Sequence, residues 1–249
     1  MQDALLEFPK IDVEKEFSEV VRSCDGTVLS DVLDGSPDFN NADYVFPQYK
    51  VVAELKCLTE DNFDSPQRNK RVDDLWRSWK NAGKVTEESV HDAYWKDMPK
   101  ALQTQIYKIL GRSIVKRIQK ANKQIRETKS RLNLHDHRGI LLLVNDGKMS
   151  FSPAATIHAA QLALQRDFRE IREFVFFTVN LFSAMKGVPV PALYWFHFHM
   201  EQARPEVNAL VDKLGQAWRR HHSSLLGNVG FASEIPDEAM EAFWFSRYI

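Results

Sequence analysis

Residues 43–58 read DYVFPQYKVVAELKCL, and this stretch predicts a β-hairpin. Both ends are rich in Val, Tyr and Phe, which favour strands, and the proline-led segment 47–50 between them is typical of a turn. We therefore expect strands over residues 43–46 and 51–58. Alternate residues of the second strand form an apolar face, Val51, Ala53, Leu55 and Cys57, while Val52, Glu54 and Lys56 face the other way.

The expected register of this hairpin brings two carboxylates together. If the strands pair across the turn, Asp43 lies opposite Glu54, with the two Cβ atoms about 5 Å apart. Facing carboxylates repel each other unless a cation lies between them, and oxygen ligands suit Mg²⁺ or Mn²⁺. The backbone carbonyl of Leu55 is a further candidate ligand. Lys56 shares the face of Glu54, where an ammonium group can orient water or stabilise charge on a phosphate, so the pattern predicts a metal centre for phosphodiester hydrolysis.

The rest of the chain predicts alternating helices and strands. Helical spacing of apolar residues, with Asp12 as the cap, predicts a helix over residues 12–24. Polar, helical sequence follows over residues 60–134, and its longest helix is expected at about 99–132. Further expected elements are strands at 139–144, 174–179 and 192–199, a turn at 145–148, a helix at 153–168 that begins with Ser-Pro, and helix again from 206.

These elements predict one α/β domain of 249 residues. Its core comprises residues 12–58 and 139–199, with a helical insert at 60–134 and a C-terminal helical part at 205–249. When the insert is set aside, the order of elements is αβββαβ around a small mixed sheet.

The acidic pair and the lysine resemble the motif of the PD-(D/E)xK nuclease superfamily, whose fold is restriction-endonuclease-like. Asp43 is followed, after ten residues, by Glu54-Leu55-Lys56 in an apolar strand. The resemblance implies an αβββαβ core and Mg²⁺ (or Mn²⁺) bound by Asp43 and Glu54. It also implies that Lys56 assists the attacking water, so that Asp43, Glu54 and Lys56 are the expected catalytic residues.

The resemblance covers roughly residues 12–58 and 139–180. Ala42 stands where the motif has a proline, so the match rests on the acidic pair and the lysine. Members of the superfamily often add a glutamate from the first helix. Glu14 and Glu16 both flank the apolar stripe of the predicted helix, and the sequence leaves the choice between them open.

The acid-x-Lys triplet alone has little weight, because the chain contains three of them: Glu54-Leu-Lys56, Glu127-Thr-Lys129 and Asp146-Gly-Lys148. Glu127 falls in a predicted helix and Asp146 in a predicted turn. Only Glu54 lies in an alternating strand with an acid on its hairpin partner.

The composition is that of a globular protein, with 44% hydrophobic and 27% charged residues, which excludes a largely disordered chain. Two cysteines exclude a disulfide scaffold. The sequence lacks an apolar run of membrane-spanning length and a signal-peptide pattern, so we expect a cytoplasmic protein without a membrane partner. It also lacks a glycine-rich phosphate loop and a nucleophile elbow.

Charge is distributed unevenly along the chain. Residues 1–46 carry 11 acidic and 3 basic side chains, whereas residues 100–138 carry 11 basic and 2 acidic ones. The basic segment predicts a helix face that neutralises nucleic-acid phosphates, with Lys116, Lys120 and Lys123 as the candidate contacts. A solvated helix face without a partner is the alternative.

His197 and His199 alternate on a predicted strand and therefore share a face. Such a pair can bind Zn²⁺, but the sequence shows no further ligand nearby. We therefore expect two ordinary strand histidines.

These observations predict a Mg²⁺-dependent nuclease. The resemblance favours DNA over RNA as the substrate, and restriction, repair or anti-phage defence would all fit. The alternative is a module of the same fold that binds nucleic acid or protein without catalysis, as a subunit of a larger system. A homo-oligomer or a partner subunit is compatible with both.

Overall fold

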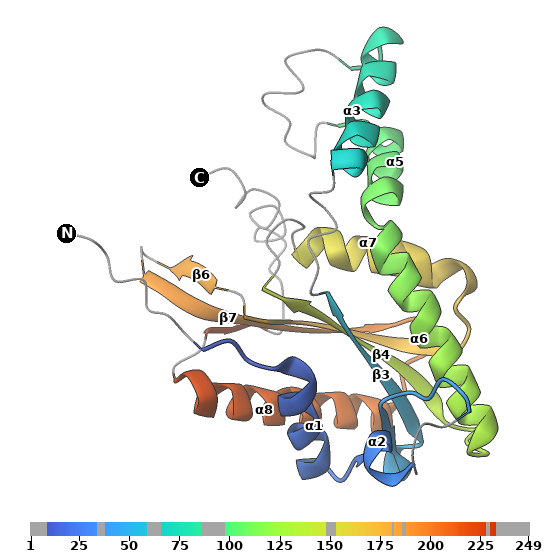
Figure 1. The fold of residues 1–249 in the computed structure, drawn as a ribbon, viewed down its shortest axis with the longest axis vertical. Coiled ribbons are helices and arrows are strands. Elements are labelled where there is room, and N and C mark those ends of the chain that lie inside the picture. Colours follow the sequence, from blue (N-terminus) through green and yellow to red (C-terminus); the bar gives the residue numbers. More distant parts are fainter. Residues whose placement is uncertain are drawn as a thin grey trace.

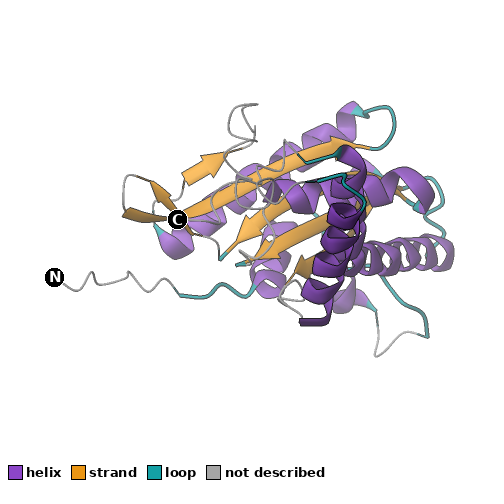
Figure 2. Cartoon of the chain, turned by 90° about the horizontal axis from the view of Figure 1, so that it is seen from above, coloured by secondary structure: helices purple, strands orange, loops and turns teal. Residues whose placement is uncertain are grey.

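The computed structural model describes residues 9–33, 38–58, 66–85, 98–147, 153–180, 182–185, 188–227 and 230–232. These residues form an α/β fold in which helices cover both faces of a mixed sheet (Figure 1). The strands run side by side across the molecule when it is seen from above (Figure 2). In this part of the chain, no helix combines the length and the apolar character needed to cross a bilayer.

The helices are α1 (Val13–Ser23), α2 (Leu29–Val32), the 3₁₀ turn η1 (Pro47–Tyr49), α3 (Pro66–Asn81), α5 (Lys100–Leu110), α6 (Arg112–Arg131), α7 (Pro153–Asp167) and α8 (Pro205–Leu226). The strands are β1 (Thr27–Val28), β2 (Tyr44–Phe46), β3 (Val51–Leu58), β4 (Arg138–Asp146), β5 (Ile171–Val179), β6 (Phe182–Met185), β7 (Val188–His199) and β8 (Gly230–Ala232). Their order in the sheet is β1-β2-β3-β4-β5-β7-β6, and β8 pairs with β7.

The structure confirms the hairpin and its register. Phe46 lies opposite Val51 and Tyr44 opposite Ala53, with β2 antiparallel to β3. The turn is η1 followed by Lys50, whose φ of 49° is in the left-handed region. The next position along the same register places Asp43 against Glu54, as expected from the sequence.

Two apolar cores lie on opposite faces of the sheet. On one face α1 and α8 pack against a cluster that includes Phe17, Phe177 and Trp218, all fully buried. On the other face α6 and α7 cover a second cluster, which includes Ile118 and Phe174. Because β3, β4 and β5 run parallel between these layers, β4 is apolar on both sides, as predicted for a buried strand.

Strand β4 is longer than the sequence suggested. The predicted turn at 145–148 is wrong for residues 145 and 146, which continue β4, and Asp146 lies opposite Val179 of β5. The Nδ2 of Asn180 donates a hydrogen bond of 2.6 Å to Asp146 Oδ1, and this bond holds the carboxylate at the strand end.

The single long helix predicted at about 99–132 is also wrong. It is interrupted at Gly111, which separates α5 from α6. The two helices serve different cores, since Ile106 of α5 packs in a small cluster with α3, whereas Ile114 of α6 packs against the sheet. Glycine is a poor helix former, and it allows the change of direction between them.

Helix α6 is part of the core rather than of an insert. It makes the crossover between the parallel strands β3 and β4 and buries Ile118 and Ile125 on the sheet. Three short strands were not predicted, β1, β6 and β8, and β8 lies in the part expected to be helical. The remaining predicted C-terminal residues, 233–249, lie outside the described residues.

Candidate metal centre

The position of Asp43 is set by a loop that is fastened to α6. The backbone N–H of Asn40 donates to Glu127 Oε2 at 2.9 Å, and Gln124 Nε2 donates to the carbonyl of Asn41 at 2.8 Å. The N–H of Ala42 donates to Thr128 Oγ1 at 2.7 Å in a buried position. These three bonds hold the residues just before Asp43, so its side chain enters the site from a fixed backbone.

Asp43 lies at an open edge of β3. Strand β2 begins at Tyr44, so beyond that residue β3 has no strand partner on this side. The Oδ2 of Asp43 accepts a hydrogen bond of 2.8 Å from the N–H of Leu55, which would otherwise be unpaired. The N–H and C=O of one strand residue point to the same side, so the Leu55 carbonyl faces this edge as well. Burial raises the pKa of Asp43, and this effect outweighs the hydrogen bond from Leu55, which by itself lowers the pKa.

Glu54 is fully buried, with an exposed fraction of 0%. Its Oε1 accepts a hydrogen bond from the ammonium group of Lys56, whose side chain is 15% exposed. Its Oε2 is buried and receives no hydrogen bond from a donor among the described residues, and the side chain meets the Asp43 carboxyl group. Burial and, second, the negative charge of Asp43 raise the pKa of Glu54 to about 8.

This arrangement fits a divalent cation. A buried carboxylate oxygen without a donor is costly unless a cation or a proton satisfies it. Asp43, Glu54 and the Leu55 carbonyl offer only oxygen ligands, the set that suits Mg²⁺ or Mn²⁺. In the chain by itself, the Lys56 ammonium supplies the only positive charge bonded to this pair among the described residues.

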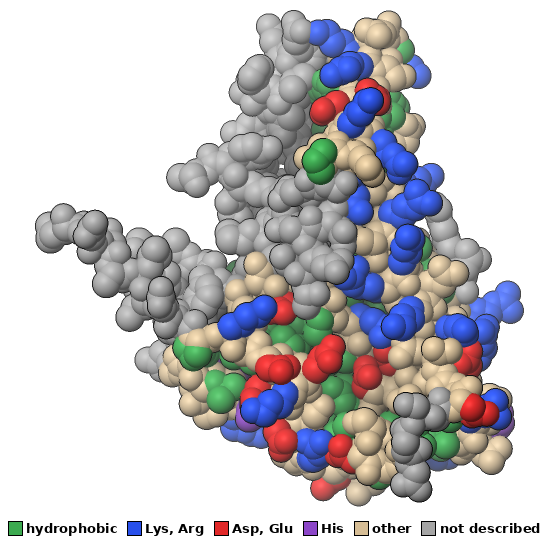
Figure 3. Space-filling model, viewed as in Figure 1, with side chains coloured by type: hydrophobic (Ala, Val, Ile, Leu, Met, Phe, Trp, Pro, Cys, Tyr) green, Lys and Arg blue, Asp and Glu red, His purple; other side chains and the backbone are tan. Residues whose placement is uncertain are grey.

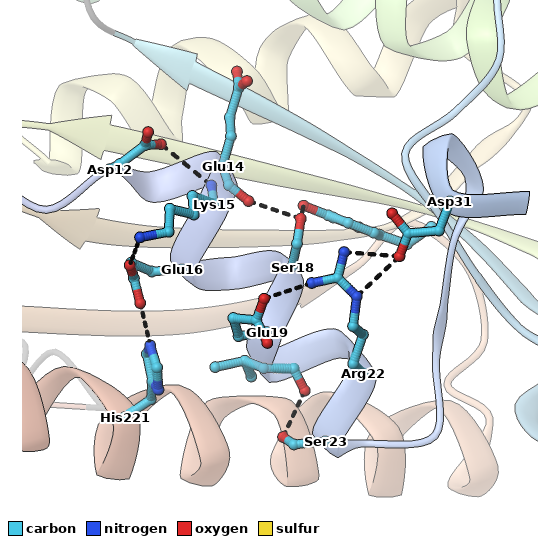
Figure 4. A network of polar contacts seen from close by, with 12 residues as sticks. Asp12, Glu14, Lys15, Glu16, Ser18, Glu19, Arg22, Ser23, Asp31 and His221 are labelled. Carbon is cyan, nitrogen blue, oxygen red and sulfur yellow. Dashed lines mark hydrogen bonds and ion pairs between the residues drawn. The ribbon is translucent and has the colours of Figure 1, made fainter. Parts of the chain in front are cut away.

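The structure distinguishes the two glutamates of α1. The carboxylate of Glu16 accepts a bond of 2.7 Å from His221 and lies 3.3 Å from Lys15 Nζ. Its hydrogen bond with His221 lowers its pKa. Glu14 points away from that contact (Figure 4), and its charge helps to raise the pKa of Asp43. Glu14 is therefore the glutamate of α1 whose charge reaches Asp43.

A cleft of about 350 Å³ lies beside the start of α1, and neither Asp43 nor Glu54 lines it. Glu14, Cys57 and Asp146 contribute to its lining. Burial, followed by the charge of Glu14, raises the pKa of Cys57 to about 12, so the thiol stays protonated. Sequence reasoning placed Asp146 in a turn and missed it, because its position depends on the pairing of β4 with its neighbours.

The predicted nucleic-acid contacts lie on the outer face of α6. Lys116, Lys120 and Lys123 are all exposed, and they line a cavity of about 560 Å³ together with Arg126. Lys and Arg gather over α5 and α6 in Figure 3, while acidic side chains gather over α1. Arg117 points inward instead, and its Nε donates at 3.2 Å to the carbonyl of Cys57 on the open edge of β3. Helix α6 thus links the basic surface to the carboxylates.

Comparison with protein-family models, with curated proteins and with solved structures gives no match.

Proposed function

We propose that this chain is a divalent-metal-dependent nuclease of the PD-(D/E)xK type. Asp43, Glu54 and the Leu55 carbonyl would hold Mg²⁺ or Mn²⁺, with Glu14 at the rim. The observation that carries the proposal is the buried Oε2 of Glu54, which receives no hydrogen bond from a donor and lies against a second carboxylate. Without a cation, a proton held by Glu54 is what reconciles the two buried carboxyl groups, and a bound divalent ion would take its place.

The order of elements supports the same proposal. When the short turns α2 and η1 and the helices α3 and α5 are set aside, the succession α1, β1, β2, β3, α6, β4 is αβββαβ. The two-residue strand β1 and the crossover helix α6 supply the elements that the sequence assigned elsewhere. The acidic pair lies at the point of the hairpin where the superfamily carries its motif.

The residues divide the chemistry among themselves. When bound, the cation would activate a water molecule and stabilise negative charge on the phosphate. Asp43 and Glu54 would orient it with fixed carboxylates, since both are held by neighbouring strands. Lys56 would leave Glu54 and donate to the attacking water or to a phosphate oxygen, where its charge favours the transition state. Lys116, Lys120 and Lys123 would hold the nucleic-acid backbone.

A cleavage assay tests the proposal. The protein is incubated with supercoiled and linear plasmid, single-stranded DNA and RNA, each with Mg²⁺, Mn²⁺ or EDTA. Metal-dependent cutting should fall at least about 100-fold in Asp43→Asn and Lys56→Met, a loss typical of a missing transition-state contact. Lys50→Met is the matched control, because Lys50 lies in the same hairpin but is exposed and paired with Asp136. Cutting that survives both site substitutions would refute the proposed site.

A nucleic-acid-binding module without catalysis is the second candidate, because the basic face of α6 is independent of the carboxylates. It predicts salt-dependent DNA binding that needs no metal and is unchanged in Lys56→Met. DNA binding in EDTA together with no cleavage of any substrate would favour this function.

A further inference from the structure

Three ligand-type side chains converge at the far end of the sheet. Glu173 of β5 lies opposite His199 of β7, and His197 is two residues earlier on the same face. Glu173 Oε2 is 3.0 Å from His197 Nε2 and 2.6 Å from His199 Nδ1. The expectation that the two histidines lack a further ligand is therefore wrong, because strand pairing supplies Glu173 from a distant part of the sequence.

We propose that Glu173, His197 and His199 form a Zn²⁺ site. One oxygen or nitrogen atom from each residue lies within 4.8 Å of the other two. Around a tetrahedral zinc ion with bonds of about 2.0–2.1 Å, ligand atoms are roughly 3.4 Å apart. Small rotations of the imidazoles and the carboxylate therefore suffice to place all three on one ion.

The surroundings of Glu173 suit a metal ligand. The residue is fully buried, and Arg138, 5% exposed, places its Nε 2.6 Å from Glu173 Oε1. Arg138 is itself fixed, since its Nη2 donates at 2.9 Å to the carbonyl of Gln202. One carboxylate oxygen is thus oriented by a neighbouring cation and the other is directed at the histidines. Ligating carboxylates commonly have such an outer partner.

The histidines give the site both its metal preference and its access. Imidazole nitrogen suits Zn²⁺ rather than Mg²⁺, which prefers oxygen. The side chain of His197 is 16% exposed and that of His199 is 33% exposed, so an ion can enter from solvent. His199 also lines a cavity of about 340 Å³. With three protein ligands, the fourth coordination position would be left for water or a substrate atom.

This site is separate from the Asp43–Glu54 pair. Glu54 lies in register with Leu141 on the face covered by α6, whereas Glu173 lies in register with Ile140 on the face covered by α8. The two glutamates are two strands apart, which is about 10 Å at ordinary strand spacing. One ion cannot serve both, so each site can be removed while the other is kept.

Metal binding to the full chain tests the proposal. Protein freed of metal by a chelator is titrated with Zn²⁺ against a chromophoric competitor, and with Co²⁺ to record the visible absorption of a four-coordinate ion. The titrations use Glu54→Gln, so that the acidic pair does not contribute. We expect one equivalent in this background and a loss of at least about 100-fold in affinity when His197→Gln and His199→Gln are added, because loss of an outer partner alone costs 10–100-fold. His135→Gln, at an exposed position, is the matched control and should bind as the background does.

Three results would overturn the site: no binding in the Glu54→Gln background, binding retained by the double histidine variant, or an octahedral Co²⁺ spectrum. If the double variant does not fold, as judged by circular dichroism, X-ray absorption at the zinc edge of the unaltered chain decides. Two imidazole nitrogens in the first shell support the site, and an all-oxygen shell refutes it. These readouts do not depend on cleavage, so failure here leaves the proposed nuclease function untouched.

Discussion

The substitution Glu54→Gln should make the metal-free protein more stable. The pKa of Glu54 is about 8 in the folded protein, against an ordinary value of 4.5. At pH 7 the folded state therefore keeps a proton that the unfolded chain releases. Each pH unit between the unfolded value and the solution pH is 1.36 kcal/mol, so this proton costs about 3 kcal/mol of the free energy of unfolding. Glutamine has the same shape and no proton to lose, so it removes the cost.

The sign of the pH dependence follows from the same shift. Because the folded pKa is raised, the stability contributed by Glu54 is complete below the unfolded pKa and is lost as the pH rises through about 8. Between about pH 6.5 and 8 the ionisation of Glu54 should lower the free energy of unfolding of the parent protein by about 2 kcal/mol. The variant lacks this carboxyl group, so its free energy of unfolding should not show this decrease. Added Mg²⁺ should reduce the difference in the free energy of unfolding between the variant and the parent, because only the parent can bind the ion at the Glu54 carboxylate.

The assay is urea unfolding in EDTA across this pH range, followed by tryptophan fluorescence, to which the buried Trp195 and Trp218 contribute. Glu19→Gln is the control, since the Glu19 carboxylate is 56% exposed and its loss should change stability by less than about 0.5 kcal/mol. The reasoning is refuted if Glu54→Gln is less stable than the parent at pH 8 in EDTA, or if the two proteins show the same pH slope.

Three further predictions concern other parts of the molecule. Gly139→Ala should cost about 3 kcal/mol or more in urea unfolding, because the new Cβ would lie 2.0 Å from the carbonyl oxygen of Glu170; a cost below about 1 kcal/mol would contradict this packing. Burial lowers the pKa of His222 to about 4, so the free energy of unfolding of the parent should fall by up to about 3 kcal/mol as the pH falls from 6.5 toward 4. The substitution His222→Gln should abolish this decrease, and equal acid unfolding of the two proteins would count against it. The combined variant Lys116→Ala, Lys120→Ala and Lys123→Ala neutralises the exposed face of α6. It should reduce the slope of log DNA affinity against log salt concentration by up to about 0.9 per lysine, and an unchanged slope would mean that DNA binds elsewhere.

Local pattern was sufficient for much of the fold. The alternation in β3 and the length of its turn determined the register that sets Asp43 against Glu54, because a one-residue slip would turn Leu55 out of the core. Helix α1 is recognisable from its periodicity, α7 from its Ser-Pro start, and the buried strands β4 and β5 from their continuous apolar runs. In each case the signal lies within a single short segment.

Features that depend on long-range pairing could not be predicted in this way. The choice between Glu14 and Glu16 depends on where α8 places His221, and the partner of the two β7 histidines is fixed by the pairing of β7 with β5. Strand β1 has two residues, too few for any periodicity. The break at Gly111 lies between two helices that pack in separate cores. The apolar spacing in the sequence continues through this position and therefore does not indicate the break.

The parallel pairing of β3 with β4 also determines when the acidic pair is formed during folding. Asp43 and Glu54 meet in a hairpin, whose closure is local and expected to be fast, whereas β4 is separated from β3 by a long stretch of chain and is expected to pair later. Until then the two carboxylates remain hydrated and repel each other weakly. Their water is removed when β4 and α6 dock, so the electrostatic cost of burying two carboxylates together arises at this later step. Divalent ions would therefore influence the rate at which the chain reaches its native state, in addition to the stability of that state.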